Sequence, residues 1–341
     1  MRLIVAFAWC TMIASACRHS GANHSKPLAQ LNSSDKAQAS PSGIGPLNVR
    51  WNSGLPDCTR NHDDAVQVFS KDVDTFILRQ NICLTAEAPF LYLLIGKTKA
   101  LLLDTGDVAD ATLARLEPTV WQLIGDYSRA KAVPMPELVV AHTHGHTDHV
   151  AGDKQFKGVA HTTVVPLGQE AVGQFFGFKS WTGASVIYDL GERILDVLPI
   201  PGHMTDHISV FDRKTSWLLT GDSLYPGRLY TQKGHWLDYK SSMQRLLAFA
   251  RAKKPGLILG AHIELSTTAG RDYPMNQIAP RPDEHRLEMG LAHLEELVAA
   301  LNRQSVLTCE VHDDFMMWPL DAQPDCDVAL GPSPRAKPGK S

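Results

Sequence analysis

The feature that most constrains this chain is the segment 143–149, which reads Thr-His-Gly-His-Thr-Asp-His. Imidazole and carboxylate groups are the ligands that Zn²⁺ and its first-row neighbours accept. His144 and His146 are two residues apart, so in an extended segment they project to the same side and suit one metal ion. Asp148 and His149 suit a second. The chain has 15 His among its 341 residues, and this clustering favours a metal site over an exposed polar loop.

The sequence around this cluster supports a metal site at the end of a sheet. The apolar run 137–141 predicts a buried strand that ends where the cluster begins, and open α/β sheets bind ligands at the carboxyl ends of strands. His142 lies on the strand side and is expected to pack behind the site. His203, Asp222 and His262 each follow a predicted strand and a glycine that permits a sharp turn.

The predicted elements mix strands and helices. The clearest helix has leucines on one stripe and covers 284–302. This mixture predicts an α/β sandwich. The predicted strands cover 76–80, 90–95, 99–104, 137–141, 159–165, 185–188, 193–200, 208–211, 216–220 and 257–259, and the other helices cover 111–127, 167–176 and 241–253.

The N-terminus predicts export. Arg2 precedes a mainly apolar run that is too short to span a bilayer, and Ala-Ser-Ala at 14–16 is a small-residue cleavage site. Cleavage there leaves Cys17 first, as in bacterial lipoproteins, so we expect a periplasmic protein or one tethered to a membrane through a lipid on Cys17. The predicted organisation is a signal peptide at 1–16, a flexible tether at 17–48, one folded domain at 49–330 and a disordered tail at 331–341.

Net charge and cysteine content indicate which partners the protein binds and whether its cysteines are oxidised. A net charge of −3 gives no basic field, so nucleic acid is not an expected partner. Four cysteines remain after the signal peptide and Cys17 are set aside, an even number that suits disulfides in an oxidising compartment. Three pairings are open, and proximity in the sequence favours Cys58 with Cys83 and Cys309 with Cys326.

These motifs together resemble the metallo-β-lactamase superfamily over residues 75–265. Besides the cluster, the matching segments are Asp-Thr-Gly at 104–106, Pro-Gly-His at 201–203, Gly-Asp at 221–222 and Gly-Ala-His at 260–262. The resemblance implies a four-layer αββα sandwich with a two-metal site at one edge of its sheets.

The resemblance also assigns residues. It implies that His144, His146 and His203 bind the first metal, that Asp148, His149 and His262 bind the second, and that Asp222 bridges both. Asp104 and His207 are expected behind the ligands rather than among them. We expect two Zn²⁺ ions, with iron or manganese as the other candidates.

A bridging carboxylate at Asp222 resembles the glyoxalase II-like and lactonase-like branch of the superfamily. It implies a hydrolase that uses a metal-bridging hydroxide on a small-molecule ester, thioester, lactone or related carbonyl substrate, with Asp148 and Asp222 orienting the nucleophile. Tyr225 resembles a lactonase tyrosine that hydrogen-bonds the substrate carbonyl, although a tyrosine there also suits a core aromatic. Arg228, Tyr230, His235 and Trp236 follow, either as pocket residues or as an exposed loop.

Three other functions stay open, and a fourth, cleavage of RNA, is disfavoured. True zinc β-lactamases usually lack a carboxylate at the position of Asp222, so β-lactam hydrolysis is an alternative rather than the first choice. The same ligands suit an iron-dependent redox enzyme that resembles the persulfide dioxygenases. The full ligand set argues against a non-catalytic binding protein, and export and the missing basic patch argue against cleavage of RNA.

Overall fold

The computed structural model describes residues 46–322 and Cys326. The predicted signal peptide, the tether up to residue 45 and the C-terminal tail lie outside the described residues. Within the described part of the chain, no helix has both the length and the apolar character that crossing a bilayer requires.

The first sheet has six strands in sequence order. They are antiparallel from β1 to β4, and β4, β5 and β6 are parallel. The parallel strands end at the edge where the histidine cluster begins. The strands are β1 (Val66–Asp72), β2 (Thr75–Gln80), β3 (Phe90–Ile95), β4 (Lys99–Leu103), β5 (Glu137–Ala141) and β6 (Thr162–Val164).

The second sheet also has six strands, in the order β13-β12-β10-β9-β8-β7. β10 and β12 are parallel, so their carboxyl ends lie at the same edge. The strands are β7 (Val186–Asp189), β8 (Ile194–Pro199), β9 (Ile208–Asp212), β10 (Trp217–Gly221), β12 (Leu257–Gly260) and β13 (Glu288–Met289).

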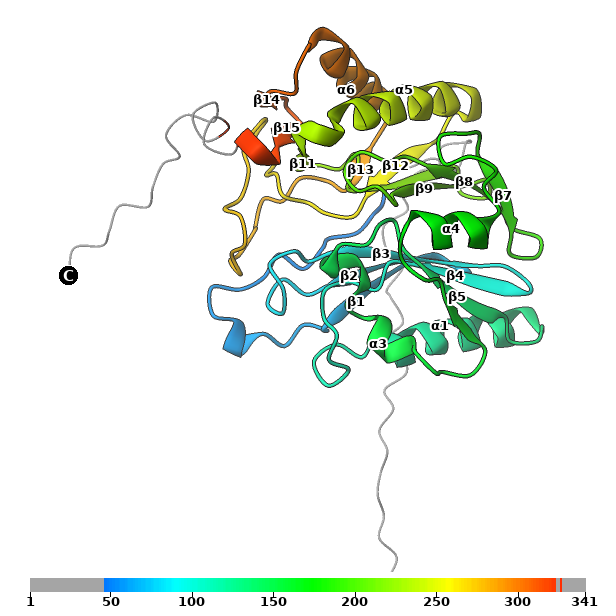
Figure 1. Ribbon diagram of the computed structural model, residues 1–341. Coiled ribbons are helices and arrows are strands. Elements are labelled where there is room, and N and C mark those ends of the chain that lie inside the picture. Colours follow the sequence, from blue (N-terminus) through cyan, green and yellow to red (C-terminus); the bar gives the residue numbers. More distant parts are fainter. Residues whose placement is uncertain (1–45, 323–325, 327–341) are drawn as a thin grey trace, which may run out of the picture. The chain divides into compact units, whose positions relative to one another are not determined.

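The two sheets pack face to face, and helices cover their outer faces (Figure 1). Neighbouring residues of a strand point to opposite faces, so Leu101 packs between the sheets while Leu102 packs under α1 (Leu116–Lys131). α3 (Asp153–Phe156) adds Phe156 to that outer layer, and α4 (Gln169–Phe176) adds apolar side chains to the inner core. α5 (Trp236–Lys253) and α6 (Leu291–Arg303) pack on the second sheet. This is the predicted αββα sandwich.

A third, smaller sheet lies beside the site. It has the order β11-β15-β14, from β11 (Arg228–Thr231), β15 (Met316–Pro319) and β14 (Glu310–Val311). β11 and β15 are parallel although almost ninety residues separate them in the sequence. These strands are not among the predicted ones, because each is short and gains its partner only through tertiary structure.

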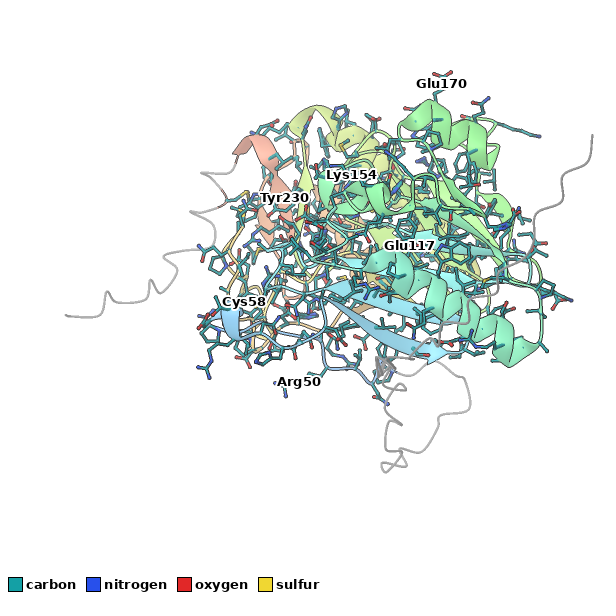
Figure 2. All side chains as sticks on the ribbon, turned by 90° about the horizontal axis from the view of Figure 1, so that it is seen from below. Arg50, Cys58, Glu117, Lys154, Glu170 and Tyr230 are labelled. Atoms are coloured by element: carbon teal, nitrogen blue, oxygen red, sulfur yellow. A yellow bond between two sulfur atoms is a disulfide. The ribbon has the colours of Figure 1, made fainter. Side chains whose placement is uncertain are left out.

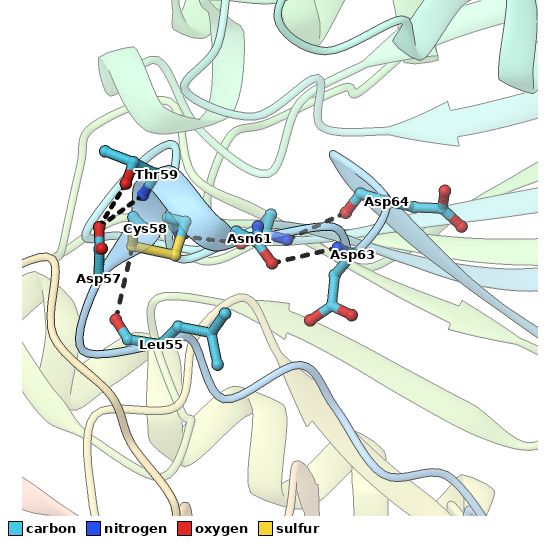
Figure 3. The surroundings of a disulfide bond; sticks show 9 residues. Leu55, Asp57, Cys58, Thr59, Asn61, Asp63 and Asp64 are labelled. Atoms are coloured by element: carbon cyan, nitrogen blue, oxygen red, sulfur yellow. Dashed lines mark hydrogen bonds between the residues drawn. A yellow bond between two sulfur atoms is a disulfide. The ribbon is translucent and has the colours of Figure 1, made fainter.

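Both favoured cysteine pairings are confirmed. Cys58 bonds to Cys83 and Cys309 to Cys326, and in each pair the Cα atoms are 5.3 Å apart. The first disulfide attaches a 3₁₀ turn, η1 (Cys58–Arg60), to the loop after β2, and Asp57 caps that turn by accepting from the backbone N–H of Thr59 at 3.0 Å (Figure 3).

Several predicted element boundaries are wrong. α1 begins at Leu116 rather than near 111, so Pro118 falls in the first turn, where its missing N–H is not needed. The helix predicted over 284–302 begins at Leu291, because β13 and Gly290 precede it. Leu287 therefore packs between the sheets and not on the helix stripe. α5 begins five residues before the predicted 241.

Candidate metal centre

All seven predicted ligands follow the carboxyl ends of strands at one edge of the sandwich. The loop after β5 carries His144 and His146, and the short helix α2 (Thr147–Val150) that follows carries Asp148 and His149. β8, β10 and β12 each lead to one of the other three. Gly221 lets Asp222 reach the loop after β5. Its φ is +52°, and a Cβ there would lie 2.7 Å from both His207 and Thr143, so only glycine fits.

The side chains form two groups, in each of which the potential ligand atoms lie within 4.8 Å of one another. The first group converges on Nδ1 of His146, which lies 2.9 Å from Nε2 of His144 and 3.0 Å from Nε2 of His203. The second contains Asp148, whose Oδ2 lies 3.2 Å from Nε2 of His262 and 3.4 Å from Nε2 of His149.

Asp222 belongs to both groups, and its two oxygens divide between them. Oδ1 lies 3.4 Å from Nε2 of both His149 and His262. Oδ2 lies 3.6 Å from Nε2 of His203 and 3.9 Å from Nε2 of His144. A carboxylate in this position can bind two ions at once.

Neighbouring acceptors set which ring nitrogens face the centre. Nδ1 of His149 donates to Asp104 Oδ2 at 2.9 Å, and Nδ1 of His203 donates to the backbone carbonyl of Tyr230 at 2.7 Å. Nδ1 of His262 donates to the carbonyl of Glu87 at 3.0 Å. In each neutral ring the Nε2 lone pair then points to the centre. Such outer hydrogen bonds orient histidine ligands in metal sites.

The buried carboxylate and the imidazole groups of the centre have polar atoms that a divalent cation would satisfy. Asp222 is 6% exposed, and its Oδ1 has no hydrogen-bond partner within the described part of the chain. A buried carboxylate oxygen is costly without a partner. Several imidazole lone pairs converge on the same point, so a cation would satisfy both kinds of group. The nitrogen and oxygen donors suit zinc, iron or manganese.

The two groups differ in charge when no metal is bound. In the first group, burial lowers the pKa of His144 well below its usual value and the pKa of His203 to about 4, so both rings are neutral. In the second group, burial disfavours the charged ring, but Asp222 and Asp148 together raise the pKa of His262 to about 10. The second group thus attracts protons where a metal would supply positive charge, and a metal ion must displace them.

Three residues lie behind the ligands, as predicted. Asp104 accepts from the backbone N–H of Thr143 at 2.6 Å as well as from His149, so one carboxylate fixes the ligand loop. His207 stacks on His144 with ring centroids 4.7 Å apart. His142 pairs with Asp153 at 2.8 Å, away from both groups.

A cavity of about 290 Å³ opens beside the centre. Tyr225, Arg228 and Tyr230 line it. His235 and Trp236 are not among its lining residues: His235 ends the 3₁₀ turn η2 (Lys233–His235), and Trp236 begins α5. Tyr225 is 1% exposed, and its hydroxyl donates to the carbonyl of Arg228. Because that donor already has a partner, the contact predicted between Tyr225 and a substrate carbonyl stays a prediction.

Several cavity residues carry no signal that was recognised in the sequence. The loop from β12 to β13 provides Glu264, Tyr273 and Arg281, and the loop before β3 provides Glu87. Glu264 follows the ligand His262 by two residues, which is a signal that could have found it. The others lie in irregular segments that carry no recognisable motif.

Comparison with known proteins places the chain in a family. The family model described as the metallo-beta-lactamase superfamily matches residues 84–262, which is more than half of the chain. A hydroxyacylglutathione hydrolase of Nostoc punctiforme is 30% identical over 95 residues, 26% of this chain and 37% of that protein. One of Bdellovibrio bacteriovorus is 27% identical over 124 residues, 36% of this chain and 47% of that protein. The chain therefore spans less than half the length of these relatives.

Solved structures are also similar. A metallo-beta-lactamase from Pontibacter korlensis has 17% sequence identity and a TM-score of 0.43, and the match covers 70% of this chain and all of that one. A metallo-beta-lactamase superfamily protein from Sulfolobus tokodaii has 14% identity and a TM-score of 0.39 over 67% of this chain and 86% of that one. The family-model match, over the stretch that runs from Leu84 to the last ligand, shows that this chain belongs to the metallo-beta-lactamase superfamily.

Proposed function

We propose that this protein is a hydrolase that uses two divalent metal ions to cleave a small-molecule ester, thioester, lactone or related carbonyl substrate. The observation that carries the proposal is the division of the Asp222 carboxylate between two ligand groups. One oxygen faces His149 and the other faces His203, so the carboxylate is placed to hold two ions close together.

The chain's own groups would hold and orient the reacting parts. Divalent ions bound here would polarise the substrate carbonyl and lower the pKa of a water molecule toward about 7. Asp148 and Asp222 offset the repulsion between two like charges, and Asp104 keeps Nε2 of His149 pointed at the centre. The adjoining cavity, about 290 Å³ in volume, suits a small substrate rather than a polymer.

The names of the relatives support a thioester as the first substrate class to test. Both describe hydrolysis of hydroxyacylglutathione, and both matches cover only about a third of this chain or less. β-Lactam hydrolysis is the second candidate, and the carboxylate at Asp222 argues against it.

We further propose that the protein is exported and tethered through Cys17. The apolar run and Ala-Ser-Ala before Cys17 support this, as do the two disulfides, which suit an oxidising compartment. The tether would hold a membrane-anchored enzyme where it meets small molecules from outside the cytoplasm.

The test is metal analysis of protein purified without added metal, followed by a panel of thioesters, lactones, β-lactams and phosphodiesters. We expect two equivalents of metal per chain and turnover of a carbonyl substrate, both lost in Asp222→Ala. Iron content with oxygen consumption would favour the redox alternative instead. Metal binding without turnover of any substrate in the panel, or unchanged activity in Asp222→Ala, would contradict the proposal.

A further inference from the structure

Four charged side chains line the cavity without belonging to the ligand groups, and three of them are already paired. Arg228 pairs with Glu264 at 3.3 Å and with Asp272, and it also donates to the carbonyl of Tyr273. The other oxygen of Glu264 accepts from the backbone N–H of Arg228 at 2.7 Å and lies 3.1 Å from the Tyr225 hydroxyl. This pair therefore holds the cavity wall together, although Nε of Arg228 has no hydrogen-bond partner among the described residues.

Arg281 is held in the same way. Its Nη1 donates to the carbonyl of Ile263 at 3.0 Å, and its Nη2 donates to the carbonyl of Ala86 at 2.5 Å. Glu284 lies 3.8 Å away and forms a bidentate pair with Arg79 at 2.6 Å for both contacts. Arg281 is 6% exposed and joins two loops of the cavity wall, so its guanidinium is also engaged.

Glu87 differs from these three. Its carboxylate lines the cavity, yet no group in residues 46–322 or Cys326 forms a hydrogen bond or ion pair with it. The backbone on both sides is fixed, since the carbonyl of Glu87 accepts from His262 and the carbonyl of Ala86 accepts from Arg281. The side chain is partly buried and lines the cavity from a bend in the loop before β3.

A partly buried carboxylate without a partner costs free energy. Such a cost suits a group that gains its partner from a bound ligand. Arg228 contacts both Glu264 and Asp272, whereas Arg281 shares Glu284 with Arg79. These three arginines and three carboxylates sum to zero charge, so Glu87 leaves a local excess of negative charge. Its carbonyl touches the ligand His262, which places it next to the point where a scissile bond would lie.

We propose that Glu87 is a specificity residue that binds a cationic amine on the substrate, close to the bond that is cleaved. This inference rests on the proposed hydrolase function and narrows its substrate class to amine-bearing carbonyl compounds. An anionic group at the same position would meet the unpaired carboxylate and be disfavoured.

The test compares two substrates that differ in one group: the alanyl and lactoyl thioesters of N-acetylcysteamine, with an ammonium or a hydroxyl beside the carbonyl. We expect Glu87→Gln to lower kcat/KM for the alanyl thioester about 10- to 100-fold, which is the range for loss of a charged hydrogen bond, mainly through KM. The lactoyl thioester should change by less than about threefold. Glu87→Asp, which keeps the charge, should recover part of the alanyl activity.

Two controls separate loss of substrate binding at Glu87 from a general effect of a Glu→Gln change and from an effect on turnover. Glu170→Gln changes an exposed residue of α4 that lies well apart from Tyr230 and the cavity, and it should leave both substrates unchanged (Figure 2). Binding of alaninamide and lactamide, measured by calorimetry, needs no turnover, and the preference for alaninamide should vanish in Glu87→Gln.

The possible failures are distinguishable. Wild-type protein that hydrolyses neither thioester, but still prefers alaninamide, contradicts the proposed function and supports the role of Glu87. Equal losses for both thioesters, or a lower metal content in Glu87→Gln, would overturn the specificity role, because either result means that Glu87 acts on the metal centre itself.

Discussion

Removal of the shared carboxylate tests the proposed two-metal centre most directly. In Asp222→Ala, the structure predicts loss of one equivalent of metal and of most of kcat, with the fold intact. The second group should suffer more, because Oδ1 lies 3.4 Å from its two histidines whereas Oδ2 lies 3.6 and 3.9 Å from those of the first. The first group also keeps three converging imidazoles.

The size of the effect follows from charge and burial. Two unit charges about 4 Å apart interact with about 4 kcal/mol where the effective dielectric constant is about 20. Asp222 is 6% exposed, so water screens it little. Since about 1.4 kcal/mol changes an equilibrium constant tenfold, loss of one such interaction should weaken binding about 10³-fold.

The assay is metal content by mass spectrometry after dialysis against buffers of defined free zinc, with circular dichroism to confirm the fold. Asp222→Asn keeps the shape of the side chain and should show the same loss. Asp196→Asn is the matched control, because Asp196 is 2% exposed but pairs with Arg213 and Lys253 away from the centre. Wild-type protein that saturates with one metal ion and turns over normally would refute the binuclear mechanism.

Three further predictions concern export, disulfides and stability. Mass spectrometry of the mature protein should find Cys17 at its N-terminus, Cys17→Ser should release it from the membrane fraction, and a cytoplasmic protein that still begins at Met1 would contradict both. Thiol titration of unfolded, unreduced protein should find none of the four paired cysteines free, and four reactive thiols would refute the pairing. Arg193→Ala should cost about 3–5 kcal/mol in urea unfolding, because it leaves the fully buried Asp212, now 2.7 Å from the guanidinium, without its charged partner. Arg213→Ala, which breaks a pair with a 39% exposed arginine side chain, should cost about 1 kcal/mol or less, and equal losses in the two variants would contradict this reasoning.

The positions of the ligands could be read from the sequence because the signals are local. Four of the seven lie within six residues, and each of the other three follows a strand and a glycine. The strands before His203, Asp222 and His262 are recognisable from their apolar runs. Because strand ends in a sandwich meet at shared edges, these residues could be expected beside the cluster, where the structure has them. The disulfides were predictable for the same reason, since each joins cysteines that are close in sequence.

Helix starts and edge strands depended on tertiary contacts. Leu287 continues the leucine stripe of α6 in the sequence, but the pairing of β13 with β12 directs it between the sheets. β1 is a half-exposed edge strand whose alternation is interrupted by a bulge, so its apolar pattern is weak. The local helix and strand preferences of these residues could not decide where α6 begins or whether β1 forms. Both depend on burial against residues that are distant in the sequence.

The substrate cavity was decided by tertiary structure alone. Glu87, Glu264 and Arg281 lie in irregular loops, where no periodicity marks which side chains face inward. Arg281 meets the carbonyl of Ala86 across 195 residues of sequence, and Glu87 meets His262 across 175. The sequence by itself therefore located the candidate metal ligands, which short motifs encode. Only the fold determined which carboxylate beside the metal centre is left without a partner, because pairing depends on where distant loops meet.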